Sequence, residues 1–268
     1  MGNKKKLIKK IVVTGGGSGG HLSAAEAIIQ ELSNKYEITK KNFLYIGGDL
    51  GMEGERIGNS IEQKKFKNAS FSCKYIRAGK LQRAFSINTM FLLFRTFLGF
   101  YDSYKILKKF TPDIVISTGG FVSVPVCTMA KLLKADIYLH EQTSTVGLSN
   151  KIVGKFSKKI FLAYKSSAKF FKNEKAIHVG NLVRKDILET KGSGQVVQAL
   201  KKMIVNQEEY PIIYISGGSL GSHILNDTVR SALHNLLNKY QIIVQTGENK
   251  TFMDYDKLVK EKVTLDDH

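Results

Sequence analysis

The sequence predicts an α/β protein with a parallel, doubly wound sheet, organised as twin Rossmann-like domains with the second domain incomplete. Short apolar runs alternate with longer amphipathic segments as far as Val179. A glycine-rich turn follows the first apolar run, and a similar turn follows the apolar run that ends at Ser216. Repeated strand and crossover helix is typical of a parallel sheet with helices on both faces. Two similar glycine turns indicate two Rossmann-like halves that face a cleft.

The first half contains seven predicted strands: Lys10–Thr14, Phe43–Gly47, Ser72–Arg77, Ile114–Ser117, Asp136–His140, Lys159–Ala163 and Ala176–Val179. The predicted helices between them include Leu22–Ser33, Ile87–Phe110 and Val122–Leu133. After a polar stretch that ends at Gly194, the pattern restarts with helix Val196–Val205, strand Pro211–Ser216, helix Ser222–Tyr240 and strand Gln241–Gln245. Two strands are too few for a self-sufficient domain. We therefore expect one domain at residues 1–183 and an incomplete one at residues 184–268.

The chain is strongly basic, with 41 Lys and Arg against 23 Asp and Glu and a net charge of +18. Such an excess attracts nucleic acid, acidic lipid or phosphorylated substrates, although a lysine-rich genome produces the same bias without any function. No nucleic-acid recognition motif accompanies the lysines, so a nucleic-acid partner is not expected. Cys73 and Cys127 stand far apart in no metal-ligand spacing. They are expected to be core residues in a reducing compartment.

No segment has the features of a signal peptide or a spanning helix. The basic N-terminus leads into a short apolar run, Ile11–Val13, which falls short of the about 7–15 apolar residues that a signal peptide needs. The most apolar region, Phe85–Tyr101, is interrupted by Asn88 and Arg95 and lacks the ~20 apolar residues of a spanning helix. We therefore expect a cytoplasmic protein that touches a membrane without crossing it.

Four segments carry the candidate chemistry. The first strand leads into Gly16-Gly17-Ser18-Gly19-Gly20-His21, and the later one into Gly217-Gly218-Ser219-Leu220-Gly221. Glycine turns before helices expose backbone N–H groups at the positive end of the helix dipole, which suits a phosphate. Gly119-Gly120 follows the fourth strand, and His140-Glu141-Gln142-Thr143 ends the fifth. The carboxyl ends of parallel strands line one crevice, where a histidine and a glutamate can take a hydroxyl proton.

A nicotinamide-binding protein is an alternative, because Gly15, Gly17 and Gly20 also fit the dinucleotide motif. That motif wants an acidic residue about 20 positions further on. Here the second strand ends at Gly48-Asp49, which is further along the chain. NAD(P) binding would support this alternative.

Five segments together resemble a known family. They are GGGSGGH (15–21), STGGFVSVP (117–125), HEQTSTVGLSNK (140–151), GNLVRKD (180–186) and GGSLGSHILN (217–226). In order and spacing they are similar to the signature segments of the MurG family, the N-acetylglucosaminyltransferases of glycosyltransferase family 28. The resemblance implies a GT-B fold and an inverting transfer from UDP-GlcNAc to undecaprenyl-diphospho-N-acetylmuramoyl-pentapeptide in peptidoglycan synthesis. It implies no cofactor and no metal, and a peripheral location at the cytoplasmic face of the cell membrane.

The resemblance also implies roles for matching residues. His21 and Glu141 resemble catalytic or acceptor-positioning groups. The implied donor contacts are Ser18, Gly19, Gly20, Thr143, Arg184 and Ser219. The implied acceptor contacts are Gly119, Gly120, Gln142 and Asn150. Thr143 stands where the family usually has asparagine, and it offers one donor where an amide offers two.

The family's segment for uracil, ribose and sugar lies beyond His268, so we expect this chain to be inactive by itself. An alternative is an acceptor-binding half that works with a separate donor-binding subunit. Asp254-Tyr255-Asp256 matches the D-x-D spelling of metal-dependent transferases, but it is expected on a solvated helix face.

A membrane-facing patch is expected around Leu81–Arg95, which is apolar with basic residues between. Phe91, Phe94 and Leu98 are expected to be buried against the sheet. Exposed apolar side chains such as Phe85, with Lys80 and Arg83 nearby, would meet an anionic membrane surface.

Overall fold

The structure is a computed structural model that describes residues 9–50, 58–78, 87–189, 198, 210–218, 221–247 and 251–266. The side chains of residues 87–94 are outside this description. The chain divides into two compact units, Met1–Glu189 and Thr190–His268. The sequence prediction put the boundary between residues 183 and 184. Each unit is described by itself.

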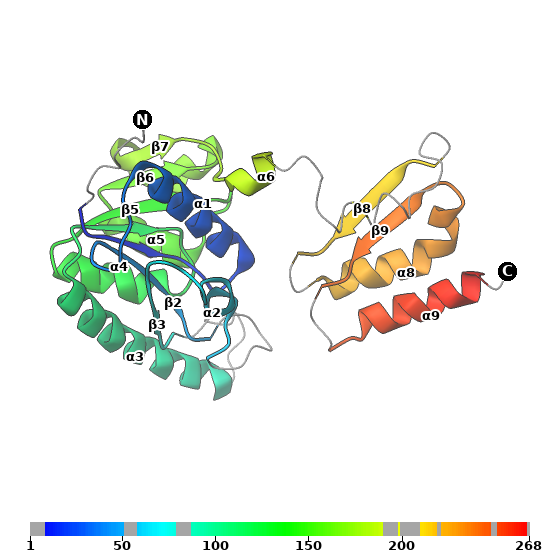
Figure 1. The fold of residues 1–268 in the computed structure, drawn as a ribbon, viewed down its shortest axis with the longest axis horizontal. Coiled ribbons are helices and arrows are strands. Elements are labelled where there is room, and N and C mark those ends of the chain that lie inside the picture. Colours follow the sequence, from blue (N-terminus) through cyan, green and yellow to red (C-terminus); the bar gives the residue numbers. More distant parts are fainter. Residues whose placement is uncertain are drawn as a thin grey trace. The chain divides into compact units, whose positions relative to one another are not determined.

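Unit 1 is built on a seven-stranded sheet in the order β3-β2-β1-β4-β5-β6-β7, and every described strand pair is parallel (Figure 1). The strands are β1 Ile11–Thr14, β2 Phe43–Gly48, β3 Ser72–Ile76, β4 Ile114–Ser117, β5 Asp136–Glu141, β6 Lys159–Leu162 and β7 Ala176–His178. The order reverses direction at β1, which is the switch point of a Rossmann-like sheet. The predicted α/β class and all seven predicted strands are confirmed, with ends that differ by a residue or so.

Helices cover both faces of this sheet because the strand residues alternate in direction. Ile11 and Val13 pack with Leu22 and Ile29 of one helix, whereas Val12 belongs to a core on the opposite face. The first face carries α1 Gly19–Lys35 and α2 Ile61–Lys65. The second face carries α3 Ile87–Phe110, α4 Ser123–Leu132, α5 Leu148–Phe156 and the 3₁₀ helix η1 Lys165–Phe170. A second 3₁₀ helix, η2 Asn173–Lys175, comes directly before β7.

Helix α1 begins three residues earlier than the apolar pattern predicts, because Ser18 takes an extended conformation (φ −159°) and Gly19 starts the helix. This early start matters for the site, because it places Gly19 and Gly20 of the glycine-rich loop in the first turn of the helix. Of the two free cysteines, Cys127 is fully buried, and burial raises its pKa to about 12. The expectation of a core cysteine is confirmed for Cys127, whereas Cys73 is half-buried.

Unit 2 has a parallel pair of strands, β8 Ile212–Ser216 and β9 Gln241–Gln245, with helices α8 His223–Leu237 and α9 Asp254–Asp266. A short helix, α6 Lys185–Glu189, ends unit 1. The two strands and the helix after β8 agree with the sequence prediction. The predicted helix Val196–Val205 lies almost wholly outside the described residues.

The prediction of a solvated face for the D-x-D residues is wrong for Asp254. Its side chain is 8% exposed, and its carboxylate accepts hydrogen bonds from Asn226 at 3.0 Å and from His223 at 2.8 Å. Burial opposes ionisation, yet these hydrogen bonds prevail and lower the pKa of Asp254. Asp256 is exposed, as expected. The first aspartate therefore joins α9 to the start of α8.

Candidate functional site

The candidate site lies at the carboxyl edge of the unit 1 sheet, where β1, β4 and β5 end side by side. Thr14 pairs in register with Ser117, and Ser117 pairs with Leu139. The loops that follow these three strands therefore meet at one edge, beside the switch point. They are the loops that the sequence analysis selected.

The loops after β1 and β4 pack backbone against backbone. Gly120 has φ +86°, and a Cβ there would lie 2.0 Å from the carbonyl oxygen of Gly16. Gly119 has φ +95°, and a Cβ there would lie 2.5 Å from Oδ1 of the buried Asn150. Only glycine combines these dihedrals with such close approach. The glycine pair thus allows the loops after β1 and β4 and the buried side-chain amide of Asn150 to pack closely.

Fewer backbone N–H groups of the first loop are available to an anion than the sequence suggests. The amide of Gly17 donates to the carboxylate of Glu62, and the amide of Gly16 donates to Gly119 O at 3.4 Å. These two N–H groups already have protein acceptors. The amides of Gly19 and Gly20 lie in the first turn of α1, where no intrahelical acceptor exists. An anion would therefore bind at the start of α1, where the helix dipole also favours negative charge.

A pocket of about 440 Å³ opens between these loops, within the usual size range of small-molecule sites, about 300–1,000 Å³. Its polar wall comes from the first loop and α1, and its apolar wall comes from α4 and α5. The lining residues are Gly16, Gly17, Ser18, His21, Thr96, Gly120, Phe121, Val124, Leu148, Ser149 and Ile152.

His21 is held in one orientation at this pocket. Its Nδ1 lies 2.7 Å from Thr118 O and 3.2 Å from Oε1 of Gln142. Both neighbours are carbonyl oxygens that accept hydrogen bonds, so Nδ1 carries the proton of the neutral ring. The other nitrogen, Nε2, then has a free lone pair. A neutral imidazole in this tautomer can accept a proton from a substrate hydroxyl.

Gln142 links His21 to a second histidine. Its Nε2 lies 3.2 Å from Nδ1 of His140, and Nε2 of His140 lies 3.2 Å from Gly180 O. Because Gly180 O only accepts, His140 donates through Nε2 and accepts through Nδ1. Burial lowers the pKa of His140, which favours this neutral form. Gln142 therefore donates through Nε2 to His140 and accepts through Oε1 from His21, so donation runs from His21 through Gln142 and His140 to Gly180 O.

Glu141 is buried beneath the loop after β5. Its Oε1 accepts from the amide and the hydroxyl of Thr143 at 2.9 and 2.7 Å, and its Oε2 accepts from Asn150 at 2.9 Å. None of these three residues is among those that line the pocket. This geometry favours a role for Glu141 in holding the loop. Its catalytic assignment, and the substrate contacts of Thr143 and Asn150, stay predictions.

The predicted donor residues are only partly described. Arg184 donates to Glu26 of α1 at 2.7 Å, and Glu26 also lies 3.2 Å from Lys65 Nζ. Arg184 thus lies against α1 within unit 1. Ser18, Gly19 and Gly20 come together at the start of α1. Ser219 lies outside the described residues, as do Lys80, Arg83 and Phe85 of the predicted membrane patch.

The structure argues against the nicotinamide alternative, because the acidic residue after β2 is already paired. The carboxylate of Asp49, after β2, lies 2.6 Å from the guanidinium of the buried Arg95. That carboxylate is therefore used within the protein, where a dinucleotide site needs it for a ribose hydroxyl. The same contact removes Arg95 from the predicted basic surface. Among the described residues, no group of three or more His, Cys, Asp or Glu side chains could hold a metal ion; the absence of a metal requirement stays a prediction.

Sequence reasoning missed the side chains that hold the first loop from within. Glu62 is fully buried under Gly16 and Gly17, and the hydroxyl of Tyr45 donates to Gly15 O at 2.6 Å. Ser60 and Gln63 form a capping box that starts α2, and that S-x-x-Q spacing is visible in the sequence. Nothing in the sequence pairs Glu62 with the loop. It reaches the loop only because α2 packs beside β2.

A Rossmann-like parallel sheet with glycine loops and a pocket at its switch point places the chain in the doubly wound α/β class. Residues 11–162 match the glycosyltransferase family 28 N-terminal domain, and the chain belongs to that family.

A curated relative agrees with this membership. The chain is 38% identical over 242 residues to UDP-N-acetylglucosamine–N-acetylmuramyl-(pentapeptide) pyrophosphoryl-undecaprenol N-acetylglucosamine transferase 3 of Bacillus thuringiensis. That alignment covers 90% of this chain and 63% of the relative, so the chain spans less than two thirds of its length.

In fold, the chain is similar to Acinetobacter baumannii MurG, with a TM-score of 0.59, 18% identity and coverage of 94% of this chain and 63% of that one. It is also similar to a UDP-GlcNAc 2-epimerase from Neisseria meningitidis bound to UDP-GlcNAc, with a TM-score of 0.60, 13% identity and coverage of 95% and 70%. The expected GT-B class is confirmed, and neither the nicotinamide nor the separate-subunit alternative is favoured.

The described part of the chain contains no helix that is both long enough and apolar enough to cross a membrane.

Proposed function

We propose that this chain carries the acceptor-binding half of an inverting N-acetylglucosaminyltransferase that uses UDP-GlcNAc and undecaprenyl-diphospho-N-acetylmuramoyl-pentapeptide. The observation that carries the proposal is His21, held with Nε2 free beside a pocket between two glycine loops. The names of the curated relatives support the two substrates. The proposed product is the disaccharide lipid of peptidoglycan synthesis.

In the proposed reaction, a hydroxyl oxygen of the acceptor sugar attacks the anomeric carbon of UDP-GlcNAc. The bond between that carbon and the diphosphate oxygen breaks, UDP leaves, and the configuration inverts. Nε2 of His21 takes the hydroxyl proton. Gln142 and Thr118 hold the ring from the other side, and Glu141 and Asn150 hold the loop that carries Gln142. The amides of Gly19 and Gly20, with the hydroxyl of Ser18, would bind substrate phosphate oxygens.

We propose that the protein works at the cytoplasmic face of the cell membrane, because one face of α3 carries exposed aromatic and basic side chains. Phe97, Tyr101 and Tyr104 are 73%, 55% and 38% exposed and follow one helical stripe. Lys105 lies over the ring of Tyr101 and Lys108 over that of Tyr104. Aromatic rings with flanking lysines suit the boundary of an anionic membrane. Leu98, on the same helix, is half-buried.

A hybrid enzyme tests the transfer proposal. Residues 1–189 replace the matching domain of the Bacillus thuringiensis relative, so that the relative supplies the rest of the enzyme. Transfer from radiolabelled UDP-GlcNAc to a lipid-linked muramoyl-pentapeptide is then measured. We expect labelled lipid product, and its loss with His21→Ala. A folded hybrid that binds both substrates and yields no product would contradict the proposal.

Vesicle sedimentation tests the membrane proposal. Changing both Phe97 and Tyr101 to serine should reduce binding to anionic vesicles, and higher salt should weaken binding further. Tyr255→Ser in α9 is the control, since that ring is 64% exposed but lies on unit 2. If neither higher salt nor the double substitution of Phe97 and Tyr101 weakened binding, a role for the α3 face would be refuted.

A further inference from the structure

A carboxylate that the proposed reaction does not use lies inside the first glycine loop. Glu62, on α2, is fully buried, and its Oε1 accepts a hydrogen bond from the amide of Gly17. A Cβ at Gly16 would lie 2.0 Å from the same oxygen, so the loop turns directly around it. The carboxylate thus occupies the inside of a turn whose sequence suits a phosphate.

The position of Glu62 is fixed by the packing of α2. The Ser60–Gln63 capping box starts this helix, and the hydroxyl of Ser60 donates to Gly48 O at 2.8 Å. A Cβ at Gly47 would lie 3.3 Å from Cβ of Glu62, so the side chain leaves α2 directly against the end of β2. The carboxylate is therefore held at the loop by the same contacts that place α2.

This arrangement changes what the turn can bind. A glycine turn binds a diphosphate by donating consecutive backbone N–H groups to it. In the first loop, the amide of Gly16 donates to Gly119 O at 3.4 Å and the amide of Gly17 donates to the carboxylate of Glu62. A hydrogen bond to an ionised acceptor is about twice as strong as one between neutral groups. A phosphate at Gly17 would have to displace this carboxylate and would lie beside its charge, where water screens the repulsion little.

The matching turn of unit 2 has a different acceptor. Gly17 and Gly218 have nearly the same φ, +76° and +81°, and a serine follows each of them. The amide of Gly218 donates to the hydroxyl of Ser216 at 3.3 Å. A hydroxyl is uncharged and can either accept or donate, so it can release this amide to a phosphate and then donate to the phosphate itself. An ionised carboxylate only accepts, so Glu62 cannot do the same.

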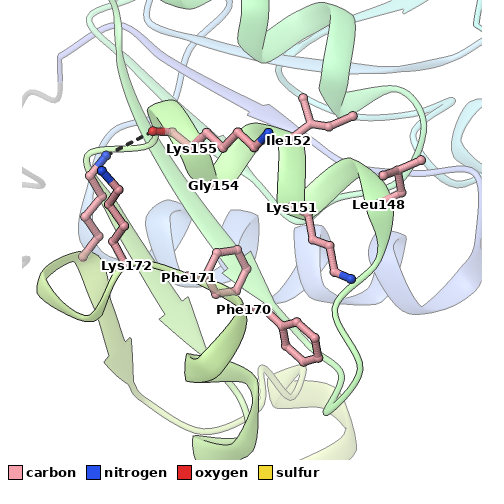
Figure 2. Close-up of a pocket in the computed structure, with 9 residues that line it drawn as sticks. Leu148, Lys151, Ile152, Gly154, Lys155, Phe170, Phe171 and Lys172 are labelled. Atoms are coloured by element: carbon pink, nitrogen blue, oxygen red, sulfur yellow. Dashed lines mark hydrogen bonds between the residues drawn. The ribbon is translucent and has the colours of Figure 1, made fainter.

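A pocket lined by four lysines does not replace the anion position of the first loop. The pocket, of about 380 Å³, lies beside α5 and is lined by Lys151, Lys155, Lys172 and Lys175. Figure 2 shows that the ammonium groups of Lys151, Lys155 and Lys172 point to different sides of it. Lys175 donates to Lys155 O at 3.2 Å. One diphosphate cannot meet these charges together, so the positive charge of the chain does not by itself create a diphosphate site here.

We propose that Glu62 is a specificity-determining residue, whose buried carboxylate excludes a diphosphate from the turn at Gly16 and Gly17. The first loop can then take an anion only at the start of α1, through the amides of Gly19 and Gly20. The inference deepens the proposed function and rests on it in one respect, since it leaves the diphosphate of UDP to a part of the enzyme other than this turn. Glu62 acts through the loop and does not take part in the chemistry.

NMR of the 268-residue chain with ¹⁵N-labelled glycine tests the inference, with inorganic diphosphate as the probe. In the unaltered chain, diphosphate should shift the amide signal of Gly17 far less than those of Gly19 and Gly20, and Gly154 reports on the lysine-lined pocket. Glu62→Gln keeps the size of the side chain and removes its charge. The Gly17 signal should then shift as much as its neighbours, and diphosphate should bind the first loop about tenfold more tightly or better, because a like charge at close range is removed.

The matched control is Glu37→Gln, which removes the same charge from an exposed residue beyond the far end of α1. It should leave diphosphate binding unchanged, because solvent and salt screen a charge at that distance. Glu62→Met removes both the charge and the acceptor at similar length, and it provides the same readout if Glu62→Gln does not fold. A Gly17 shift in the unaltered chain equal to that of Gly19, no gain in the Glu62 variants, or an equal gain in Glu37→Gln would each overturn the inference.

The proposed function and the role of Glu62 can fail separately. If the hybrid transfers GlcNAc while Gly17 follows diphosphate in the unaltered chain, the role of Glu62 fails and the function stands. If Gly17 follows diphosphate only in the Glu62 variants while a folded hybrid that binds both substrates yields no product, the function fails and the selectivity of the loop stands.

Discussion

Two glycine loops of similar sequence, one after β1 and one after β8, have different surroundings. The first is enclosed by the β4–α4 loop and by the buried carboxylate of Glu62. In the second, Gly218 has φ +81°, and a Cβ there would meet nothing within 4 Å. The strands behind them differ as well, since β1 is fully buried whereas Tyr214 of β8 is 62% exposed. The second loop is packed at Gly221, where a Cβ would lie 1.8 Å from Thr246 O, so its open position is Gly218.

The histidines that follow the two loops extend this comparison. Nδ1 of His21 donates to a backbone carbonyl, which leaves Nε2 at the pocket. Nδ1 of His223 instead lies 2.8 Å from the carboxylate of Asp254, and its ring stacks on Phe252 at 3.9 Å. The first histidine thus has the arrangement that the proposed reaction requires, and the second joins α8 to α9 and the segment before it.

The largest expected effect comes from adding a methyl group to each loop region. Gly120→Ala combines a left-handed backbone with a clash against Gly16 O, so we expect a loss of about 3–5 kcal/mol in the free energy of unfolding. Gly218→Ala has nearly the same φ without a clash, so only about 1–2 kcal/mol should be lost. Urea unfolding of both variants measures the difference. Equal losses would show that Gly120 is no more tightly packed than Gly218.

Next in size is the difference between the two histidines. His21→Ala in the hybrid enzyme should lower kcat about a hundredfold or more, as for a lost general base, with little change in KM for UDP-GlcNAc. His223→Ala in the 268-residue chain should instead lower stability by about 1–3 kcal/mol, since the buried Asp254 loses a partner. Unchanged turnover for His21→Ala would remove this histidine from the mechanism.

Substitutions of the two aspartates in the D-x-D sequence should also differ in their effect on stability. Asp254→Asn should destabilise the chain by about 1–2 kcal/mol, because the buried carboxylate accepts from both Asn226 and His223. Asp256→Asn, at an exposed position, should change the free energy of unfolding by less than about 0.5 kcal/mol. Chemical denaturation of both variants provides the comparison, and similar losses would contradict the structural role of Asp254.

The smallest effect concerns pH. The pKa of His140 is lowered by burial, so below the ordinary histidine pKa of 6.5 the unfolded chain takes up a proton that the folded chain does not. This contribution to stability is therefore lost as pH falls from about 6.5 towards the lowered pKa, at no more than about 1.4 kcal/mol per pH unit. His140→Gln should flatten this part of the pH profile in urea unfolding, and the exposed His178→Gln should not. Identical profiles would contradict a buried neutral His140.

Much of unit 1 could be predicted because strand and helix periodicity reflects burial on the two faces of a sheet. The alternation of Ile11, Val12 and Val13 between two cores shows this directly. The glycine loops and His21 were also visible, since few residue types can occupy such turns. The role of Glu62 was not visible, because it lies 45 positions from Gly17 and meets it only through packing of α2. Asp254 was placed on a solvated face for the same reason, since its partners are on another helix.

The sequence by itself determined the order of strands and helices, the glycine turns and the membership of the family, because these depend on local patterns of residue type. Only the tertiary structure decided which groups at the site are free. It paired the amides of Gly16 and Gly17 with protein acceptors, and it fixed the tautomer of His21 through Thr118 and Gln142. The physical reason is that hydrogen bonds and packing between distant segments depend on distances in space, which residue order does not specify.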